Sequence, residues 1–201
     1  MYMFNWEAHA QHQSNLVAIC RQHQQDQRTS GVAATVKSGL YESDFDFLLD
    51  PNPSTAALLQ WGRSCLFEAA KHANQNRWPP GARIGVNIHE SWCHITQNGG
   101  YHDMHIHPNS AWSAIYYVDA GDSDVETRSG LNRFYAPWTV AYSDISTRYC
   151  SEVSSIDIQP QDGSLVVFPS WLPHAATPYQ GTRPRVVIAF NAVFIDGGRS
   201  E

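Results

Sequence analysis

From Ala82 onward the sequence consists of short apolar and aromatic runs closed by Gly, Pro, Asn or Asp, and this punctuation constrains the fold most. Runs of this length are typical of β-strands, and many in succession are typical of an all-β sandwich or barrel. The tripeptide Gln161-Asp162-Gly163, for example, is a turn signal. We predict strands near residues 83–89, 92–97, 103–107, 112–118, 132–136, 155–159, 164–168, 173–177 and 185–194.

The residues before Ala82 have a helical pattern instead. Residues 6–27 are polar and rich in Gln and His, with a few apolar residues between Leu16 and Cys20, and we predict a helix there. A second helix is predicted over 54–75, because Pro53 suits a helix N-terminus and apolar residues then recur at spacings of three and four. We therefore expect a mainly β fold with flanking helices outside a β-sandwich.

Length, charge and cysteine usage exclude several classes of protein. The chain has 201 residues, which favours a single domain over 1–201. Its net charge of −6 argues against nucleic acid as the main partner, because binding phosphates requires a basic face. No apolar run approaches the ~20 residues of a membrane-spanning helix, and no signal peptide is visible. The four cysteines are widely spaced without a CxxC pair, which favours reduced thiols and a cytoplasmic location.

The densest group of candidate ligands lies in the segment YHDMHIHPNSAWSAIYYVD. His105 and His107 are two residues apart, so on a strand both imidazoles share one face and can bind one metal ion. Imidazole suits Fe, Zn, Cu and Ni. Taken alone, the pair also fits two surface histidines at a strand end, because Pro108 ends the strand directly after it.

A third candidate ligand, His174, follows an apolar run and a turn bracketed by Pro169 and Pro173. Taken alone, it also fits an ordinary loop residue. A distant His that joins an i, i+2 pair is the usual topology of metal sites in double-stranded β-helix barrels. The joint pattern therefore favours one divalent-metal site held by His105, His107 and His174.

Arg185 opens an alternating strand whose residues 185, 187, 189 and 191 share a face. An Arg that points into a barrel beside a metal requires an anion, and its guanidinium matches a carboxylate in two-point contact. Without the metal site, pairing of Arg185 at a strand start with a surface Asp is the favoured explanation.

The order and spacing of these segments resemble the Fe(II)- and 2-oxoglutarate-dependent oxygenase superfamily, in particular a branch with an H-x-H-P…H…R motif. The resemblance extends over roughly residues 82–194. It implies a double-stranded β-helix core of the jelly-roll or cupin-like kind over 82–194, with residues 1–81 as a helical support region. The matching segments are 105–108, 113–117, 160–163, 168–174, and Arg185 with Phe190 and Asn191.

The resemblance also implies a chemistry and a set of roles. Fe(II) would be the metal and 2-oxoglutarate the co-substrate, which is decarboxylated as dioxygen is reduced and a small-molecule or peptide substrate is hydroxylated. Arg185 would bind the far carboxylate of 2-oxoglutarate, and Tyr117 lies where the superfamily often has a second partner for that carboxylate. Ser113 shares the parity of Tyr117. Arg183 is a rival anion partner, although Pro184 separates it from the regular strand.

One position departs from the superfamily pattern. The usual triad is His-x-Asp/Glu plus a distal His, and here His107 stands where the carboxylate is expected. Three neutral imidazoles leave the metal with a higher net charge than two imidazoles and a carboxylate. Asp103 has the same strand parity as His105 and is the alternative carboxylate, whereas His102 has the opposite parity.

Other residues are expected to have structural roles. His89 and His94 are predicted to be hydrogen-bonded core or rim residues, and Asn191 to satisfy backbone groups near a strand end. The segment 120–150 fits a lid over the site, a substrate loop or an insertion. Four tryptophans are expected in the core or in the pocket wall: Trp92, Trp112, Trp138 and Trp171.

Two other functions stay open on the sequence alone. One is a cupin-like metalloprotein with three His ligands that acts without 2-oxoglutarate, and the other is a non-catalytic metal-binding barrel. Arg185 separates the first from a dioxygenase, because only a co-substrate carboxylate gives a buried Arg a role. Turnover of 2-oxoglutarate separates an enzyme from a binding protein.

Overall fold

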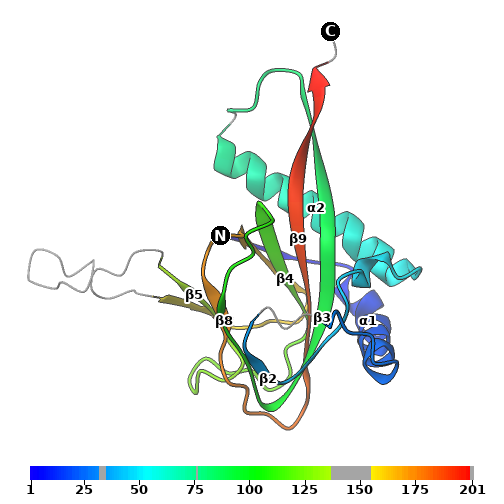
Figure 1. Ribbon diagram of the computed structural model, residues 1–201, viewed down its shortest axis with the longest axis vertical. Coiled ribbons are helices and arrows are strands. Elements are labelled where there is room, and N and C mark those ends of the chain that lie inside the picture. The colour runs from blue at the N-terminus through cyan, green and yellow to red at the C-terminus, as the bar shows by residue number, and fades with distance from the viewer. Residues whose placement is uncertain (32–34, 76, 137–154, 200–201) are drawn as a thin grey trace, which may run out of the picture.

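The computed structural model describes residues 1–31, 35–75, 77–136 and 155–199. Two α-helices, a short 3-10 helix and a set of antiparallel strands make up this part of the chain (Figure 1). In chain order the elements are β1 (Tyr2–Asn5), α1 (His9–Gln25), β2 (Lys37–Glu42), η1 (Phe47–Leu49), α2 (Pro53–Asn74), β3 (Ala82–His105), β4 (Trp112–Asp119), β5 (Asn132–Tyr135), β6 (Ser155–Ile158), β7 (Ser164–Pro169), β8 (His174–Ala176) and β9 (Arg185–Arg199).

The described strands form one sheet that curls on itself. Its order is β1-β7-β4-β9-β3-β8-β5-β6, with β2 paired to β3 off this path. β3 joins the two halves, because its first arm pairs with β9 from Ala82 to Thr96 and its second arm pairs with β8 at His102 and His105. The two arms meet at Gly99, whose φ is 80°, a value that favours glycine.

Each of the central strands buries both of its faces. Tyr116, Leu165 and Ile188 belong to a core between the sheet and the helices. Their neighbours Tyr117, Val166 and Val187 belong to a second core on the opposite face, inside the curl. Successive side chains of a strand point to opposite faces, and here both faces are buried. The strand sequences are therefore apolar throughout rather than alternating between apolar and polar residues.

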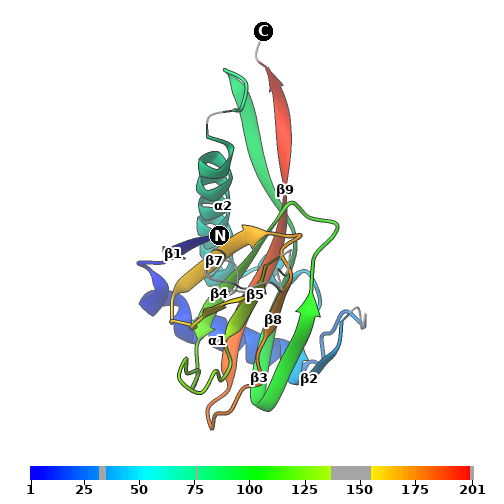
Figure 2. The ribbon, with the colours of Figure 1, turned by 90° about the vertical axis from the view of Figure 1, so that its left-hand side faces the viewer.

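Both α-helices lie on one side of the sheet (Figure 2). α2 begins where predicted, with Pro53 in its first turn and the side chain of Asn52 accepting a hydrogen bond from the Ser54 N–H at 2.8 Å. It buries Leu58 and Leu66 against the strands. α1 buries Leu16 and Cys20 in the same core.

The structure differs from the sequence prediction in three elements. The predicted helix over 6–27 begins only at His9, and residues 2–5 are strand β1, paired with β7. β2 was not predicted and pairs with β3, so the region 1–81 contributes strands as well as helices. The three strands predicted near 83–89, 92–97 and 103–107 are one strand, β3, with a register shift between Ile88 and Glu90.

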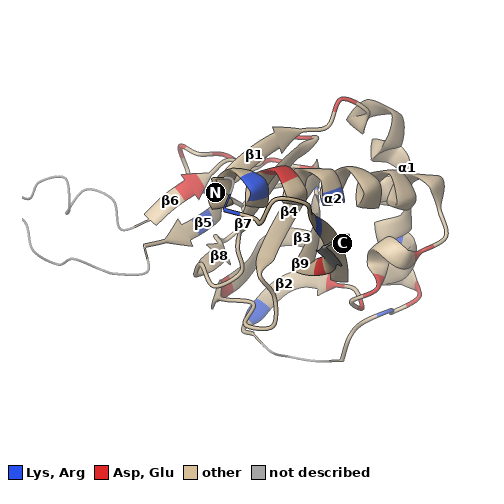
Figure 3. Cartoon of the chain, turned by 90° about the horizontal axis from the view of Figure 1, so that it is seen from above, with Lys and Arg blue, Asp and Glu red and all other residues tan. Residues whose placement is uncertain are grey.

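Charged residues of both signs are dispersed over the elements that the structure describes (Figure 3). Among the described residues, no helix is long and apolar enough to cross a membrane.

Candidate metal centre

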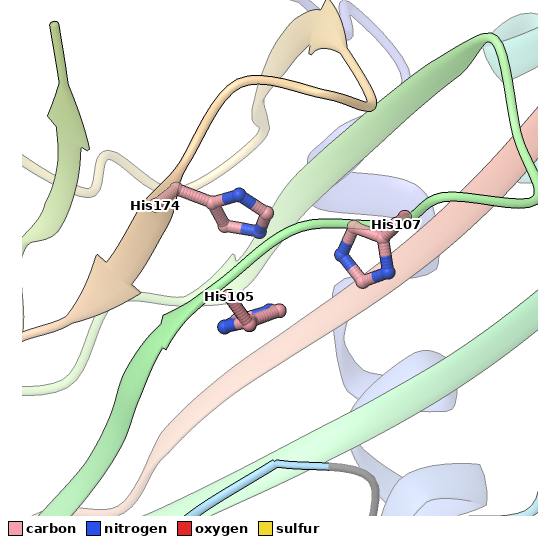
Figure 4. A group of neighbouring side chains, drawn as sticks. All are labelled: His105, His107 and His174. Atoms are coloured by element: carbon pink, nitrogen blue, oxygen red, sulfur yellow. The ribbon is translucent and has the colours of Figure 1, made fainter. Parts of the chain in front are cut away.

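Three imidazoles converge inside the curl of the sheet (Figure 4). His105 is the last residue of β3, His107 lies two residues beyond it, and His174 is the first residue of β8. Each offers one ring nitrogen, and these three nitrogens all lie within 4.8 Å of one another. The ring centroids are 4.3 Å apart for His105 and His174, and 5.1 Å apart for His105 and His107. The structure therefore brings together the three residues that the sequence grouped.

Backbone pairing explains this convergence. His105 and His174 are opposite each other in the β3–β8 register. His107 lies past the end of β3, and its backbone N–H donates to the Ser170 carbonyl at 2.9 Å. The rings of His105 and His107 thus meet on one side of the chain, as the i, i+2 spacing predicted. The strand itself ends at His105 and does not continue to His107.

Hydrogen bonds orient two of the three rings. Nδ1 of His105 donates to the Asp103 carbonyl at 2.7 Å, and Nδ1 of His174 donates to the Leu172 carbonyl at 2.9 Å. A ring whose Nδ1 carries the hydrogen has a free lone pair on Nε2, and such a carbonyl partner is usual for metal-binding histidines.

Burial keeps these imidazoles neutral. It lowers the pKa of His107 to about 4 and that of His174 to about 3, with a smaller effect from neighbouring imidazoles, and it lowers the pKa of His105 as well. Neutral imidazoles are the form that binds a metal ion. The donor set, its orientation and its protonation state all fit a divalent transition metal.

A bulge in β3 overturns the predicted parity of two neighbours. The register shifts between His102 and His105, so His102 turns inward and is only 6% exposed. Its ring stacks on His105 with centroids 4.0 Å apart. Asp103 is exposed and belongs to no group of metal-competent side chains among the described residues. The alternative in which Asp103 replaces His107 therefore has no geometric support.

Arg185 is buried in the same cavity as the imidazoles. One of its nitrogens, Nη2, donates to Oδ1 of Asn132 at 2.6 Å, and Tyr117 donates its hydroxyl to the same oxygen at 2.9 Å. The guanidinium also lies 5.7 Å from the centre of the Tyr117 ring. Its Nε has no hydrogen-bond partner in the described part of the chain.

No carboxylate of the described residues pairs with Arg185. Burial lowers the pKa of Arg185, yet an Arg side chain stays protonated in a protein. A buried cation without an anion is costly. The arrangement thus presents a charge and an open N–H donor to the cavity. Trp92, which lines the cavity too, presents a second buried donor without a partner, Nε1.

The other two candidate anion partners do not contact Arg185. Ser113 lines the cavity, but its hydroxyl bonds to Ser170 at 2.8 Å and to Oδ1 of Asn191 at 2.7 Å rather than to Arg185. Arg183 is at the surface, where its Nε donates to Asp122 at 3.1 Å. Arg183 therefore does not reach the cavity.

Several smaller predictions can be compared with the structure. His94 bonds to Glu42 at 2.7 Å and His89 to Ser110 at 3.0 Å, as hydrogen-bonded residues. Asn191 bonds to side chains, Ser113 and Glu90, and the predicted backbone role is wrong. Trp92 lines the cavity and Trp112 is half-buried, but Trp171 is 58% exposed and does not line that cavity, so its assignment to the core or pocket wall is wrong. Trp138 and residues 137–150 of the segment 120–150, which fits a lid, a substrate loop or an insertion, lie outside the described residues.

Asn132 is the site residue that the sequence prediction missed. It is 5% exposed and connects Arg185 to Tyr117. Its parity with Phe134 on the predicted strand 132–136 was a usable signal, because an Asn on the inward face of a strand requires a polar partner.

Comparisons with known proteins point to one family. A family described as "Putative 2OG-Fe(II) oxygenase" matches residues 90–191, slightly more than half of the chain. The matched segment contains His105, His107, His174 and Arg185. A search of curated proteins found no match.

Solved structures with the same fold extend over nearly the whole chain. A prolyl-4-hydroxylase from Pseudomonas putida matches with a TM-score of 0.59 at 16% identity, over 96% of this chain and 92% of that one. A viral collagen prolyl hydroxylase from Paramecium Bursaria Chlorella virus-1 matches with a TM-score of 0.57 at 12% identity, over 96% of both chains.

A third solved structure with the same fold is that of an enzyme named for a different reaction. It is the non-heme alpha ketoglutarate dependent epimerase SnoN from nogalamycin biosynthesis, with a TM-score of 0.59 at 14% identity, over 93% of this chain and 72% of that one. The predicted jelly-roll fold class is thereby confirmed. Identities this low leave the substrate open, since hydroxylases and an epimerase share the architecture.

Proposed function

The chain belongs to the 2OG-Fe(II) oxygenase family, whose enzymes use Fe(II) and 2-oxoglutarate, and from this premise we propose that His105, His107 and His174 hold the iron while Arg185 binds the far carboxylate of 2-oxoglutarate. The substrate that would be oxidised is not identified, and hydroxylation is the reaction we propose for it.

The observation that carries the proposal is the unpaired Arg185. Its guanidinium is buried, faces the cavity of the three imidazoles and has no carboxylate partner in the described residues. A fold that buries such a cation must offer it an anion. A dicarboxylate could bind the metal at the imidazoles with one end and pair with the Arg185 guanidinium through the carboxylate at its other end.

The charge balance of the site supports the same ligand. Three neutral imidazoles bring no negative charge to a divalent ion, and Arg185 adds a further positive charge. 2-Oxoglutarate is a dianion, so its binding neutralises most of this charge. The third imidazole in place of the usual carboxylate thus makes the site depend more strongly on its co-substrate.

When bound, iron and 2-oxoglutarate supply the oxidising chemistry, and the contribution of the chain is to position and shield them. The carbonyls of Asp103 and Leu172 fix the His105 and His174 rings. Asn132 and Tyr117 hold Arg185 against the cavity wall. The aromatic residues Phe134 and Phe168 lie beside His174 and exclude water from its side of the site.

Titration of 2-oxoglutarate into the anaerobic Fe(II) protein tests this proposal. The chelate is expected to give a charge-transfer band that saturates in the wild type. Arg185→Ala should weaken binding by about tenfold to several hundredfold, since a charge-assisted contact contributes about 1.5–3 kcal/mol, a buried charge pair contributes more, and each 1.4 kcal/mol is tenfold. Arg185→Lys should recover only part of the loss, because an ammonium cannot make the two-point contact.

Arg183→Ala is the matched control, since Arg183 is exposed and bonded to Asp122. It should bind 2-oxoglutarate like the wild type. Metal content should be unchanged in all three variants, because no ligand is removed. Equal binding by wild type and Arg185→Ala would remove the co-substrate role of Arg185, and no saturable binding by the wild type would contradict the proposed site.

A further inference from the structure

A second group of metal-competent side chains lies beside the three imidazoles. It consists of Glu42 at the end of β2 and of His94 and His102 on the two arms of β3. Each offers one ligand atom, and these atoms all lie within 4.8 Å of one another. His94 is 9% and His102 6% exposed, and the Glu42 side chain is 10% exposed. None of the three is a proposed ligand of the iron or of the co-substrate, although His94 and His102 line the same cavity.

Contacts within the group show that the carboxylate of Glu42 already has two partners. Nε2 of His94 lies 2.7 Å from Oε2 of Glu42. The ammonium of Lys37 bonds to the other oxygen of Glu42, and the hydroxyl of Thr35 bonds to Nε2 of His102. A carboxylate that gathers an ammonium and an imidazole around itself is a suitable anchor for a metal ion.

We propose that Glu42, His94 and His102 form a second metal site, which binds a divalent transition ion such as Zn²⁺. Two imidazoles and one carboxylate favour Zn²⁺, Fe²⁺ or Co²⁺ over Mg²⁺ and Ca²⁺, which prefer oxygen ligands alone. The site draws on ring nitrogens that neither the iron nor the co-substrate uses in the proposed function. Its ligands are therefore distinct from the proposed iron ligands, although the His102 ring stacks on that of His105.

Lys37 sets the affinity of this site. Its ammonium must leave Glu42, or be tolerated beside it, when the ion binds. The positive charge of Lys37 opposes a dication at this distance. Occupancy should thus depend on the free metal concentration, and the ion should compete with Lys37 for the carboxylate.

The position of the ligands gives the ion a structural effect. Glu42 belongs to β2, an additional strand that is joined to β3 through an irregular register between Ser38 and Leu40. His94 and His102 lie on opposite sides of the corner at Gly99. One ion would thus tie β2 to both arms of β3 and stabilise the folded state by an amount that grows with the logarithm of the free metal concentration once that concentration exceeds Kd.

Zinc stoichiometry tests the proposal without any measurement of activity. The metal-free, untagged protein is dialysed to equilibrium against a series of free Zn²⁺ concentrations and analysed for zinc and protein, which gives both the stoichiometry and the affinity. The wild type is expected to retain two ions per chain. Glu42→Gln and His174→Ala should each retain one, at the remaining site. His89→Ala is the matched control, because His89 is an exposed histidine outside both groups, and it should retain two.

A second variant keeps the test decisive if Glu42→Gln fails to fold. Lys37→Met removes the competing ammonium and should tighten binding of the second Zn²⁺ by about tenfold or more. A wild type that retains one ion per chain would overturn the proposal, as would a Glu42→Gln protein that retains two. Unchanged affinity in Lys37→Met would overturn it too. Loss of zinc only in His174→Ala would support the iron site and reject the second one.

Discussion

The neutral imidazoles of the cavity make the metal-free fold sensitive to acid. In the unfolded chain a His titrates near 6.5, whereas burial lowers the pKa of His107 to about 4 and that of His174 to about 3. At a pH between the folded-state pKa values and 6.5, the unfolded state binds more protons than the folded state. The free energy of unfolding therefore has its full value above pH 6.5 and falls as the pH drops toward 3.

We expect the unfolding free energy of the metal-free protein, measured with urea, to fall on the order of a few kcal/mol between pH 7 and pH 4, since each pKa difference of one contributes about 1.4 kcal/mol. His174→Gln should have a flatter pH dependence. His89→Gln changes an exposed His and should keep the wild-type slope. Equal slopes for all three proteins would show that burial of His174 does not link stability to pH.

At the same scale, the sequence grouped most of the residues that the structure brings together in the candidate site, and missed those whose position depends on irregular backbone. His105, His107, His174 and Arg185 could be grouped because spacing, order and resemblance agreed. His102 could not be placed, since a bulge between it and His105 reverses the parity that a regular strand implies. Asn132 was missed because its partners come from β4 and β9, far away in the sequence.

At the scale of elements, the corner of β3 decides whether the site can form. A methyl group at Gly100 would collide with the backbone of Gly39 and would lie 2.8 Å from the Gln97 carbonyl. Gly100→Ala should therefore lower the unfolding free energy by about 1–3 kcal/mol, as expected of overpacking. It should also weaken metal binding, because His102 and His105 follow the corner.

Gly85→Ala is the control within the same strand. A methyl group there meets the Ile195 carbonyl only at 3.8 Å, an ordinary contact. Its unfolding free energy should stay within about 0.5 kcal/mol of the wild type. If urea unfolding gave the same free energy for both variants, the close approach of β2 and β3 at this corner would not be a structural requirement.

The elements themselves were predictable where the pattern was strong. α2 and the strands β4 to β9 were expected within a few residues of their observed bounds, because turn residues close each apolar run. β1 and β2 were not expected, and β2 begins with the polar pair Lys37-Ser38. Their strand conformation comes from pairing with β7 and β3 rather than from their own sequence.

In the whole molecule, the two faces of the sheet have separate tasks. The core toward the helices contains Leu66, which is fully buried, while the opposite face carries the cavity. Leu66→Ala should lower the unfolding free energy by about 2–5 kcal/mol, yet the folded variant should bind 2-oxoglutarate like the wild type. Leu49→Ala, at a residue 72% exposed, should change neither quantity. A large loss of 2-oxoglutarate affinity in folded Leu66→Ala would show that the two faces are coupled.

The pairing of β3 with β9 also sets when the site can appear during synthesis of the chain. β3 carries His94, His102 and His105, but its first arm is held by β9, with Ala82 opposite Arg199 and Thr96 opposite Arg185. Contacts between such distant residues form slowly, because a long loop must close first. A nascent chain that has emerged only as far as β8 therefore has its histidines but neither the partner strand nor Arg185. The proposed iron and co-substrate site is therefore complete only once β9 has paired with β3.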